Sequence, residues 1–349
     1  MHPRRGDRHR GDPDPAVRGA PAAVVRPRPP DPLVRRPAPR CGRRRGRGRG
    51  IGAALRRGPA RVLVTSRCSR LRPRRYRGPI VLRLTKFHGL GNDFLIALAA
   101  DHPDAEHPLT PDPDVARALC ARHTGIGADG LIYGLAPGGD EADVHMVLLN
   151  ADGSEAEISG NGIRCLAQAV LRHEGRDEGD VLVETAGGVR HLRTVKGSVD
   201  GELWIQVDMG EPSDGPVPSA EAQEVSARAR ATVDIGNPHL VLLVDDLDDL
   251  DLSEVGPRVE ESFDAGINVH GVVVDSAQDL RLRVWERGVG LTQACGSGAV
   301  AAAVAAHRWG EVGPHVRVHM PGGEAVVDLD GTRALLTGPS TFVAEVVVP

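Results

Sequence analysis

Long apolar runs are absent from this chain of 349 residues. No stretch reaches the roughly 18 consecutive apolar residues that a membrane-spanning helix needs, which excludes such a helix. The first residues also lack the continuous apolar segment of a secretory signal, so we expect no such signal.

Cysteine is scarce and widely spaced. The chain has five cysteines and no Cys-x-x-Cys pair, which excludes a disulfide scaffold and a structural zinc site. This usage fits a reducing compartment, and we expect a cytoplasmic protein without a bound metal. The five are Cys41, Cys68, Cys120, Cys165 and Cys295.

Acidic residues are rare in the first part of the chain and lysine is missing from it. Residues 1–80 contain 24 Arg, no Lys, 13 Pro, 10 Gly and four acidic residues, a net charge of +20. Residues 81–349 carry 19 basic and 43 acidic residues, a net charge of −24. The formal net charge of −4 therefore describes neither part.

The arginine-rich segment 1–80 cannot bury enough apolar surface to offset the entropy of folding. One interpretation is an arm that binds nucleic acid or an anionic membrane. The others are a disordered extension, or upstream DNA of a GC-rich genome translated from a start codon placed too early. The absence of lysine and the single aromatic residue, Tyr76, favour the latter two. We therefore assign this segment no function, expect neither nucleic acid nor membrane as a partner, and place the start near Val81.

Short apolar segments bounded by glycine and aspartate recur through residues 81–349 and predict strands in mostly antiparallel sheets. Two further segments predict helices, Asn161–Glu174 and Gly298–Trp309. The second consists almost entirely of small residues, which suits a helix surrounded by a sheet. The predicted strands are Val81–Thr85, Phe94–Leu98, Gly130–Leu135, Val144–Asn150, Val181–Thr185, Leu203–Val207, His239–Val244, Gly271–Asp275, Leu280–Trp285, Val316–Met320 and Thr341–Val348.

Three short motifs, which we call landmarks, occur twice in the same order. Successive landmarks are separated by 33 and 34 residues in one half of the chain and by 29 and 29 in the other. An ordered set of this kind indicates duplicated domains. We expect one domain over 81–202 plus 340–349 and a second over 203–339, divided near Asp200-Gly201. The landmark pairs are Gly91-Asn92 and Gly236-Asn237, Gly125-Ile126 and Gly266-Ile267, and Ser159-Gly-Asn-Gly162 and Cys295-Gly-Ser-Gly298.

The third landmark predicts where the chemistry occurs. If two copies face each other across a pseudo-twofold axis, both strand–turn–helix elements meet at one site. Each turn presents free backbone N–H groups at a helix N-terminus, where the helix dipole favours an anion. A thiol at such an end has a lowered pKa, so Cys295 is predicted to be an activated thiolate. Cys120 and Cys165 are interpreted as small buried core residues.

Two long segments resemble the signatures of the diaminopimelate epimerase family. They are Asn150-Ala-Asp-Gly-Ser followed by Ser159-Gly-Asn-Gly-Ile-Arg164, and Glu286-Arg-Gly-Val-Gly-Leu-Thr-Gln-Ala-Cys295-Gly-Ser-Gly. His88-Gly-Leu-Gly-Asn-Asp-Phe94, Gly125-Ile-Gly-Ala-Asp-Gly130, Gly236-Asn-Pro-His239 and Gly266-Ile-Asn268 are similar to its other landmarks. The resemblance covers about residues 81–349.

This resemblance implies an α/β (α+β) fold of two pseudo-symmetric domains. Each is a mostly antiparallel sheet curled around a central helix, with the active site in the cleft between them, usually in a homodimer. It also implies cofactor-independent conversion of LL- to meso-diaminopimelate, on the route to lysine and peptidoglycan. Such an inversion needs a base on one face of the α-carbon, an acid on the other, and stabilisation of the charge that develops.

The resemblance implies a role for each matching residue. Cys295 and Ser159 fall on the two catalytic positions, with His239 close to the first position and Glu286 close to the second and to the substrate amine. Arg287 is suited to a bidentate grip on a carboxylate. The backbone cradle and the other substrate-binding positions match Gly160, Asn161, Gly296, Ser297, Asn92, Asn150, Asn237 and Asn268.

One position departs from the family. Its first catalytic residue is a cysteine, whereas this chain has Ser159 in an otherwise intact motif. An alcohol is a far weaker acid than a thiol, whose reference pKa is about 8.5, so Ser159 is a poor resting base. Cys165 is no obvious substitute, because about 600° of helical rotation separates the two positions.

Three hypotheses follow from this departure. Ser159 works through His239 as a relay, in a slower or asymmetric epimerase. Alternatively, one thiol suffices for an elimination or a one-sided isomerisation, as in hydroxyproline dehydratases and phenazine-type isomerases of similar fold. Last, the chain is an inactive paralogue that binds amino acids without α-proton exchange. We rank the hypotheses in that order.

Overall fold

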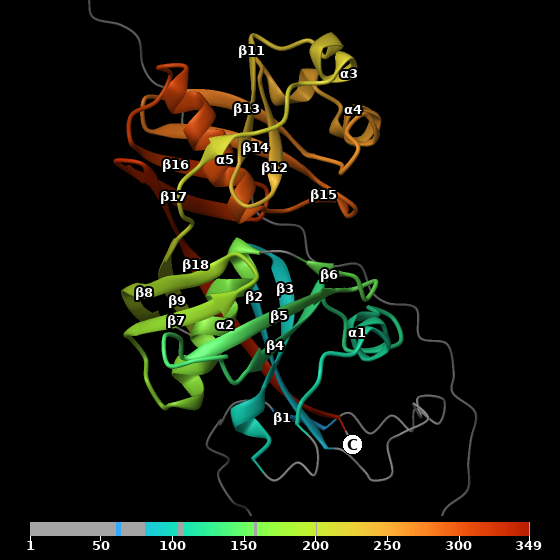
Figure 1. The fold of residues 1–349 in the computed structure, drawn as a ribbon, viewed down its shortest axis with the longest axis vertical. Helices are drawn as coiled ribbons and strands as arrows, with labels where there is room; N and C mark the ends of the chain where they lie inside the picture. Colours follow the sequence, from blue (N-terminus) through green and yellow to red (C-terminus); the bar gives the residue numbers. More distant parts are fainter. Residues whose placement is uncertain (1–60, 64–80, 104–107, 157–158, 200, 349) are drawn as a thin grey trace, which may run out of the picture. The chain divides into compact units, whose positions relative to one another are not determined.

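The computed structural model describes residues 61–63, 81–103, 108–156, 159–199 and 201–348 (Figure 1). Most of the arginine-rich extension, and with it the prediction that it is disordered, therefore lies outside the described residues. Its described part is the strand β1 (Arg61–Leu63), which pairs in parallel with the last strand, β18 (Arg333–Val348). The sequence does not predict this strand.

The first half of the described chain forms a sheet that closes on itself, which we call the N-terminal lobe. The strands pair in the order β2-β3-β4-β5-β7-β8-β9-β18, and β18 pairs with β2 to close the sheet. The β3–β4 and β5–β7 pairs are parallel, and the others are antiparallel. The strands are β2 (Leu82–Gly89), β3 (Asn92–Leu98), β4 (Gly130–Leu135), β5 (Val144–Asn150), β6 (Glu155–Ala156, beside β5), β7 (Asp180–Thr185), β8 (Gly188–Val199) and β9 (Glu202–Asp208).

The second half, which we call the C-terminal lobe, repeats this pairing pattern. Its strands pair in the order β11-β12-β13-β14-β16-β17-β18, and the β12–β13 and β14–β16 pairs are parallel. Both lobes therefore have the same alternation of parallel and antiparallel strand pairs. This agreement fits the repetition of the three landmarks in the sequence. The strands are β10 (Ser213–Asp214, beside β11), β11 (Ala229–Asp234), β12 (Pro238–Leu243), β13 (Asn268–Ser276), β14 (Asp279–Glu286), β15 (Gly290–Thr292, beside β14), β16 (His315–Met320) and β17 (Gly323–Asp330).

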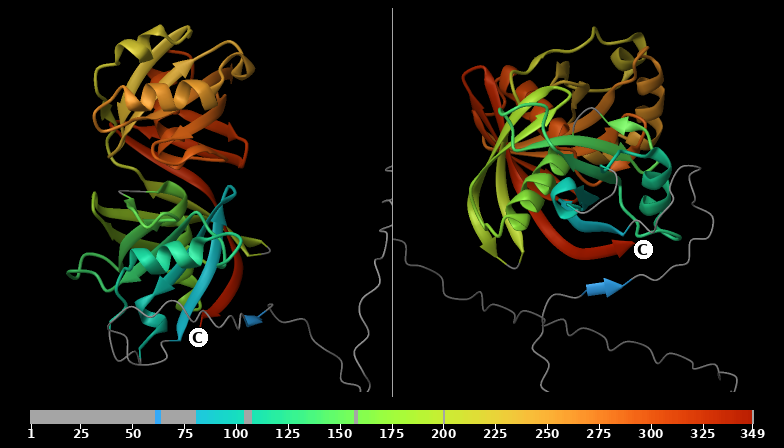
Figure 2. Two further views of the ribbon diagram at one scale, coloured as in Figure 1. Left: turned by 90° about the vertical axis from the view of Figure 1, so that its right-hand side faces the viewer. Right: turned by 60° about the horizontal axis from the view of Figure 1, so that its bottom comes forward.

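Each lobe surrounds one helix, α2 (Gly160–His173) or α5 (Gly296–Arg308), as Figures 1 and 2 show. Side chains on all faces of both helices are buried, from Gly160 to Leu171 and from Gly296 to Ala306. A helix buried on all sides must pack against strands all round, and the alanines of α5 allow those strands to approach closely. The predicted fold class is therefore confirmed.

Other helices connect the parallel strand pairs. Helix α1 (Pro113–Cys120) joins β3 to β4, and α4 (Leu252–Glu261) joins β12 to β13. The sequence pattern predicts neither helix, although parallel neighbours require such a crossover. The remaining helical segments are α3 (Ala220–Glu224) and the short 3-10 helices η1 (Ala99–Asp101) and η2 (Leu247–Asp249). No helix in the described ranges has both the length and the hydropathy of a membrane span.

The strand pairing places the change from one lobe to the other after β9, later in the chain than the expected boundary. Strand β9, which a boundary near Asp200-Gly201 assigns to the second domain, pairs with β8 and β18 in the N-terminal lobe. Strand β18 pairs with β17 of one lobe and with β2 of the other. The chain therefore passes between the lobes after β9 and again within β18.

Candidate active site

The turns before α2 and α5 have the same local geometry. Ser159 has φ −133° and ψ 116°, and its Oγ accepts a hydrogen bond from the backbone N–H of Gly162 at 3.0 Å. Cys295 has φ −129° and ψ 118°, and its Sγ accepts one from the backbone N–H of Gly298 at 3.4 Å. Each residue caps its helix, so the serine and the thiol occupy equivalent places in the two lobes.

The N-terminal ends of the two helices meet at glycine. A Cβ on Gly160 would lie 3.1 Å from the Cα of Gly296. A Cβ on Gly296 would lie 3.0 Å from the Cα of Gly160 and 2.9 Å from Cδ2 of Leu336. Both contacts are tighter than side chains normally tolerate, so glycine allows the two backbones to approach.

Four buried backbone donors lie at this meeting point. The N–H groups of Gly160, Asn161, Gly296 and Ser297 have no acceptor among the described residues. Helix N-termini leave such donors unpaired, and the helix dipole adds positive potential there. The four residues are those that the sequence predicts as a backbone cradle, and their arrangement suits an anion.

Cys295 lies beside Glu286 at the end of β14. The thiol is 6% exposed, and Glu286 accepts hydrogen bonds from Cys295 and from the hydroxyl of Thr292. Burial, and then the Glu286 carboxylate, raise the pKa of Cys295 well above its usual range. Smaller opposing effects come from Ser297 and the N–H of Gly298. The predicted lowering of the Cys295 pKa is therefore wrong for this structure, because burial and the carboxylate raise it more than the contacts with Ser297 and the N–H of Gly298 lower it.

Glu286 is itself perturbed by its surroundings. Burial raises the pKa of its carboxyl group, and hydrogen bonds from Thr292 and Cys295 oppose that shift. A carboxylate with a raised pKa is a stronger base than an exposed one. Cys295 and Glu286 thus form a hydrogen-bonded pair in which both pKa values are raised, which we call the thiol–carboxylate pair.

The equivalent place in the N-terminal lobe holds neutral side chains. Asn150 ends β5 as Glu286 ends β14, and its Nδ2 donates a hydrogen bond to Oγ of Ser154 at 3.0 Å. Ser159 is hydrogen-bonded to Gly162 and not to His239. Both ring nitrogens of His239 are engaged elsewhere, Nδ1 with His270 at 2.8 Å and Nε2 with Asn237 at 2.9 Å. The predicted relay from Ser159 to His239 is therefore absent here.

Asn92 and Asn161 belong to one hydrogen-bonded chain. Nδ2 of Asn161 donates to Oδ1 of Asn92 at 3.3 Å and to the carbonyl oxygen of Ala294 at 3.2 Å. Nδ2 of Asn92 donates to Oδ2 of Asp129 at 2.8 Å. Nη2 of the fully buried Arg164 donates to Oδ1 of Asn161 at 2.6 Å. Asn161 therefore ties α2 to the residue before Cys295, and its side chain is fully used by the protein.

Asn268 and Arg287 support each other in the C-terminal lobe. Nδ2 of Asn268 donates to the carbonyl oxygen of Pro238 at 2.9 Å, and its Oδ1 accepts from the backbone N–H of Arg287 at 3.0 Å. Nη1 of Arg287 donates to the carbonyl oxygen of Ala265 at 3.0 Å. In this structure Asn268 thus positions the loop that carries Glu286 and Arg287.

Three polar residues of this region are not predicted from the sequence. They are Asp129, Arg164 and His270. Asp129 and Arg164 lie inside motifs that the sequence singled out, Gly125-Ile-Gly-Ala-Asp-Gly130 and Ser159-Gly-Asn-Gly-Ile-Arg164. Their place in those motifs was the available signal. His270 lies within a strand of apolar residues, where its contact with His239 depends on strand register and has no local signature.

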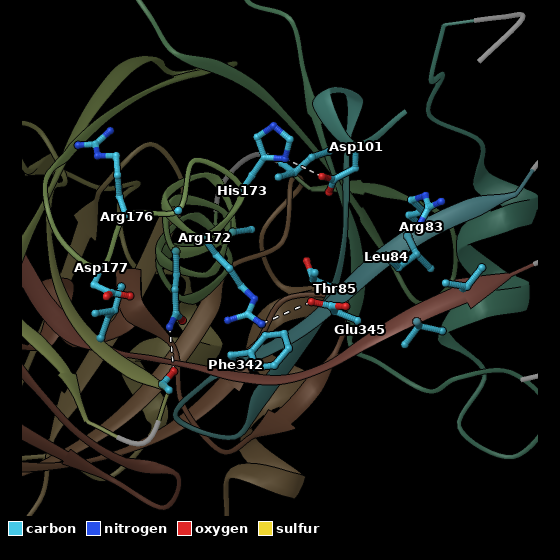
Figure 3. Close-up of a pocket in the computed structure, with 18 residues that line it drawn as sticks. Arg83, Leu84, Thr85, Asp101, Arg172, His173, Arg176, Asp177, Phe342 and Glu345 are labelled. Atoms are coloured by element: carbon cyan, nitrogen blue, oxygen red, sulfur yellow. Dashed lines mark hydrogen bonds and ion pairs between the residues drawn. The ribbon is translucent and has the colours of Figure 1, made fainter. Parts of the chain in front are cut away.

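A separate cavity of about 590 Å³ lies at the C-terminal end of α2 (Figure 3). Its Arg172 lies 3.4 Å from Glu345 and 3.9 Å from the centre of the Phe342 ring, and its His173 lies 2.6 Å from Asp101. None of the site residues predicted from the sequence lines it. Because Arg172 and His173 are already paired with carboxylates, we assign the cavity no role.

The duplicated sheets and the meeting helix ends define an epimerase-like fold. A solved structure of a predicted epimerase from Pseudomonas aeruginosa matches with a TM-score of 0.59 and 18% identity, over 76% of this chain and 98% of that one. At this identity, the likeness shows the fold alone.

Sequence comparison identifies the family. The diaminopimelate epimerase family model matches residues 84–214 and 231–343. A diaminopimelate epimerase of Desulfitobacterium hafniense is 39% identical over 280 residues, which are 75% of this chain and 96% of that protein. One from Synechocystis is 40% identical over 279 residues, which are 75% and 96% of the two chains. The chain belongs to the diaminopimelate epimerase family.

Proposed function

We propose that this chain is an isomerase that converts LL-diaminopimelate to meso-diaminopimelate without a cofactor, in the synthesis of lysine and peptidoglycan precursors. The observation that carries the proposal is the set of four buried N–H donors where α2 and α5 meet, between the two capping residues. None of the four has an acceptor in the part of the chain that the structure describes. These donors suit the α-carboxylate of an amino acid. The substrate itself is supported by the relatives of about 40% identity.

The two capping residues, Ser159 and Cys295, transfer protons on opposite faces of the substrate's α-carbon. A carboxylate held at both helix ends places the attached α-carbon between Ser159 and Cys295. The donors stabilise the negative charge that moves onto the carboxylate when the α-proton leaves. One cap then removes the proton from one face and the other cap returns a proton to the opposite face, which inverts the centre.

Cys295 supplies the stronger acid–base group. Its proton passes to Glu286, whose pKa is raised by burial, and the resulting thiolate accepts the α-proton. In the opposite direction, the protonated Cys295 donates its proton to the planar intermediate. The thiol–carboxylate pair therefore serves as the base in one direction and as the acid in the other.

Ser159 supplies the weaker partner. Its hydroxyl can donate a proton, but the alkoxide that remains is unstable, and no described side chain is in place to share its proton. We propose that turnover is slower, and asymmetric between the two isomers, for this reason. The alternative is a one-base reaction, which is either an elimination or a one-sided isomerisation. The neutral side chains of Ser159 and Asn150 favour this alternative.

We also propose that the chain acts as a cytoplasmic homodimer and that Asn92, Asn150, Asn237, Asn268 and Arg287 bind the substrate directly or through their neighbours. The family resemblance and the cysteine usage support these points. We propose no function for residues 1–80 and no nucleic-acid or membrane partner.

Exchange of the α-proton in deuterated water tests the proposed function. The purified chain is incubated separately with LL- and meso-diaminopimelate, and NMR follows both deuterium incorporation and the appearance of the other isomer. We expect incorporation coupled to isomerisation. A keto product with release of ammonia would identify a lyase instead, and binding without any exchange would identify an inactive paralogue.

A further inference from the structure

Two buried histidines of the C-terminal lobe have apolar counterparts in the N-terminal lobe. His239 and His270 are both 0% exposed, and their rings are stacked with centroids 5.0 Å apart. His239 faces Asn268 in the first register pair of β12 and β13, as Phe94 faces Gly130 in β3 and β4. His270 follows Asn268 by two residues, as Ile132 follows Gly130.

The glycines at the third position of each helix confirm this correspondence. A Cβ on Gly162 of α2 would lie 3.1 Å from Cδ1 of Ile132, and one on Gly298 of α5 would lie 2.7 Å from Cε1 of His270. The imidazole of His270 therefore packs against the first turn of α5, where Ile132 packs against α2. Because Phe94 and Ile132 serve the fold in one lobe, burying two imidazoles in the other needs a further reason.

The two rings and the amide of Asn237 form one chain of hydrogen bonds. Nε2 of His270 lies 2.8 Å from Nδ1 of His239, and Nε2 of His239 lies 2.9 Å from Oδ1 of Asn237. Nδ1 of His270 is buried and has no partner among the described residues. Burial keeps both rings neutral, because it lowers the pKa of each histidine.

Only one arrangement of protons leaves no buried N–H unpaired. If His270 donates from Nε2 to His239 and His239 donates from Nε2 to Asn237, the unpartnered Nδ1 of His270 is a bare lone pair. The reverse direction would place a proton on that Nδ1, and a buried N–H without an acceptor is the rarer and costlier defect. It would also require the amide of Asn237 to be turned by 180° about its last bond.

We propose that His270 is a positioning residue that acts through His239 to fix the amide of Asn237, with its oxygen held by the protein and its NH₂ group left for the substrate. The inference rests on the proposed function, in which Asn237 is a substrate-binding residue. An amide held in this way donates hydrogen bonds and accepts none on the substrate side. It therefore selects an acceptor such as a carboxylate oxygen and disfavours an ammonium group at the same place.

NMR of the imidazole nitrogens tests the direction of the chain without any substrate. The full chain, with its 14 histidines labelled with ¹⁵N, is studied at neutral pH. The two rings are assigned by the signals lost in His239→Gln and His270→Gln. We expect both rings to be neutral with the proton on Nε2. A proton on Nδ1 of either ring overturns the inference, whether or not the chain turns over diaminopimelate.

Kinetics of two His270 variants test the consequence. His270→Met removes the N–H group that donates to His239 and fills the same space with an apolar side chain. We expect KM to rise about tenfold with a much smaller change in kcat. His270→Gln keeps an N–H donor on a side chain of similar reach and should restore most of the affinity. Ile132→Met makes the matched packing change in the other lobe and should leave KM unchanged. An unchanged KM in His270→Met, or equal losses in the Met and Gln variants, contradicts the proposed positioning role.

Discussion

The two lobes share one strand-pairing pattern and one capping turn, yet they differ in the groups that can carry a proton. The C-terminal lobe places a thiol, a carboxylate and two imidazoles around the end of α5. The corresponding positions around α2 hold Ser159, Asn150, Phe94 and Ile132. The comparison teaches that the backbone part of the site is duplicated, because both helix ends supply donors without an acceptor among the described residues. The side chains beside the two ends differ, since a thiol and a carboxylate at α5 correspond to a hydroxyl and an amide at α2.

Removing the thiol should have the largest effect on this asymmetric site. We expect Cys295→Ala to reduce α-proton exchange by at least about 10³-fold, because the other capping residue at the meeting helix ends, Ser159, carries only an alcohol. Thermal unfolding should show that the fold is retained. Cys120→Ala removes a buried thiol at the last residue of α1. It is the matched control and should keep its exchange rate while losing some stability. Normal exchange in Cys295→Ala would disprove the role of the C-terminal cap.

Removing the charge of the carboxylate should separate the acidity of the thiol from turnover. In Glu286→Gln, the loss of the nearby negative charge lowers the pKa of Cys295, so alkylation at a fixed pH should become faster. Turnover should fall about 10- to 100-fold, because the base that takes the thiol proton is lost.

The same alkylation reaction contains its own control. Cys120 and Cys165, whose pKa values are each raised by burial to about 11, should react at unchanged rates in Glu286→Gln. Mass spectrometry of the alkylated peptides measures all three thiols at once. Slower or unchanged alkylation of Cys295 in the variant would contradict a pKa of this thiol that is raised by the Glu286 carboxylate.

A methyl group between the ends of α2 and α5 should lower both the stability of the fold and the turnover. Gly296→Ala places Cβ against Leu336 and Gly160, and we expect a loss of about 1–3 kcal/mol in the free energy of unfolding together with reduced turnover. Gly139→Ala is the control, because no atom lies within 4 Å of its added Cβ. Urea denaturation and exchange kinetics measure the two effects. Wild-type stability and activity in Gly296→Ala would mean that the helix ends do not meet closely.

The histidine pair should give the C-terminal lobe a pH dependence that the apolar pair of the N-terminal lobe lacks. Burial lowers the pKa of His270 from 6.5 to about 3 and that of His239 well below 6.5. A lowered folded-state pKa gives stability that is fully present above the unfolded-state value and is lost as the pH falls from about 6.5 towards 3. Urea denaturation at several pH values should show a shallower decline in His270→Met than in the parent or in Ile132→Met. Parallel declines would contradict buried, neutral imidazoles.

The sequence predicts the duplicated framework because its signals are local. Glycine-rich turns before two apolar helices, and apolar strands between turn residues, are visible without any tertiary contact. Helices α1 and α4 were missed because each is short and lies between strands. The pairing of β9 with β8 depends on sheet register, so the domain boundary near Asp200-Gly201 separated two paired strands.

The candidate site could be predicted only as far as its motifs extend. Ser159, Cys295 and the four cradle residues follow from the capping turns and the family resemblance. The protonation of Cys295 could not be predicted, because it depends on burial and on the approach of Glu286. The engagement of His239 by His270 likewise depends on the register of two parallel strands.

The central claim is that Cys295 carries the strong acid–base step and Ser159 the weak one. Deuterium exchange at the α-carbon of LL- and meso-diaminopimelate, compared for the parent, Ser159→Cys and Ser159→Ala, tests it most directly. We expect Ser159→Cys to exchange faster from at least one isomer, because a thiol restores a titratable group on that face, and Ser159→Ala to exchange much more slowly from one isomer than from the other. Full activity of Ser159→Ala with exchange from both isomers would contradict the account.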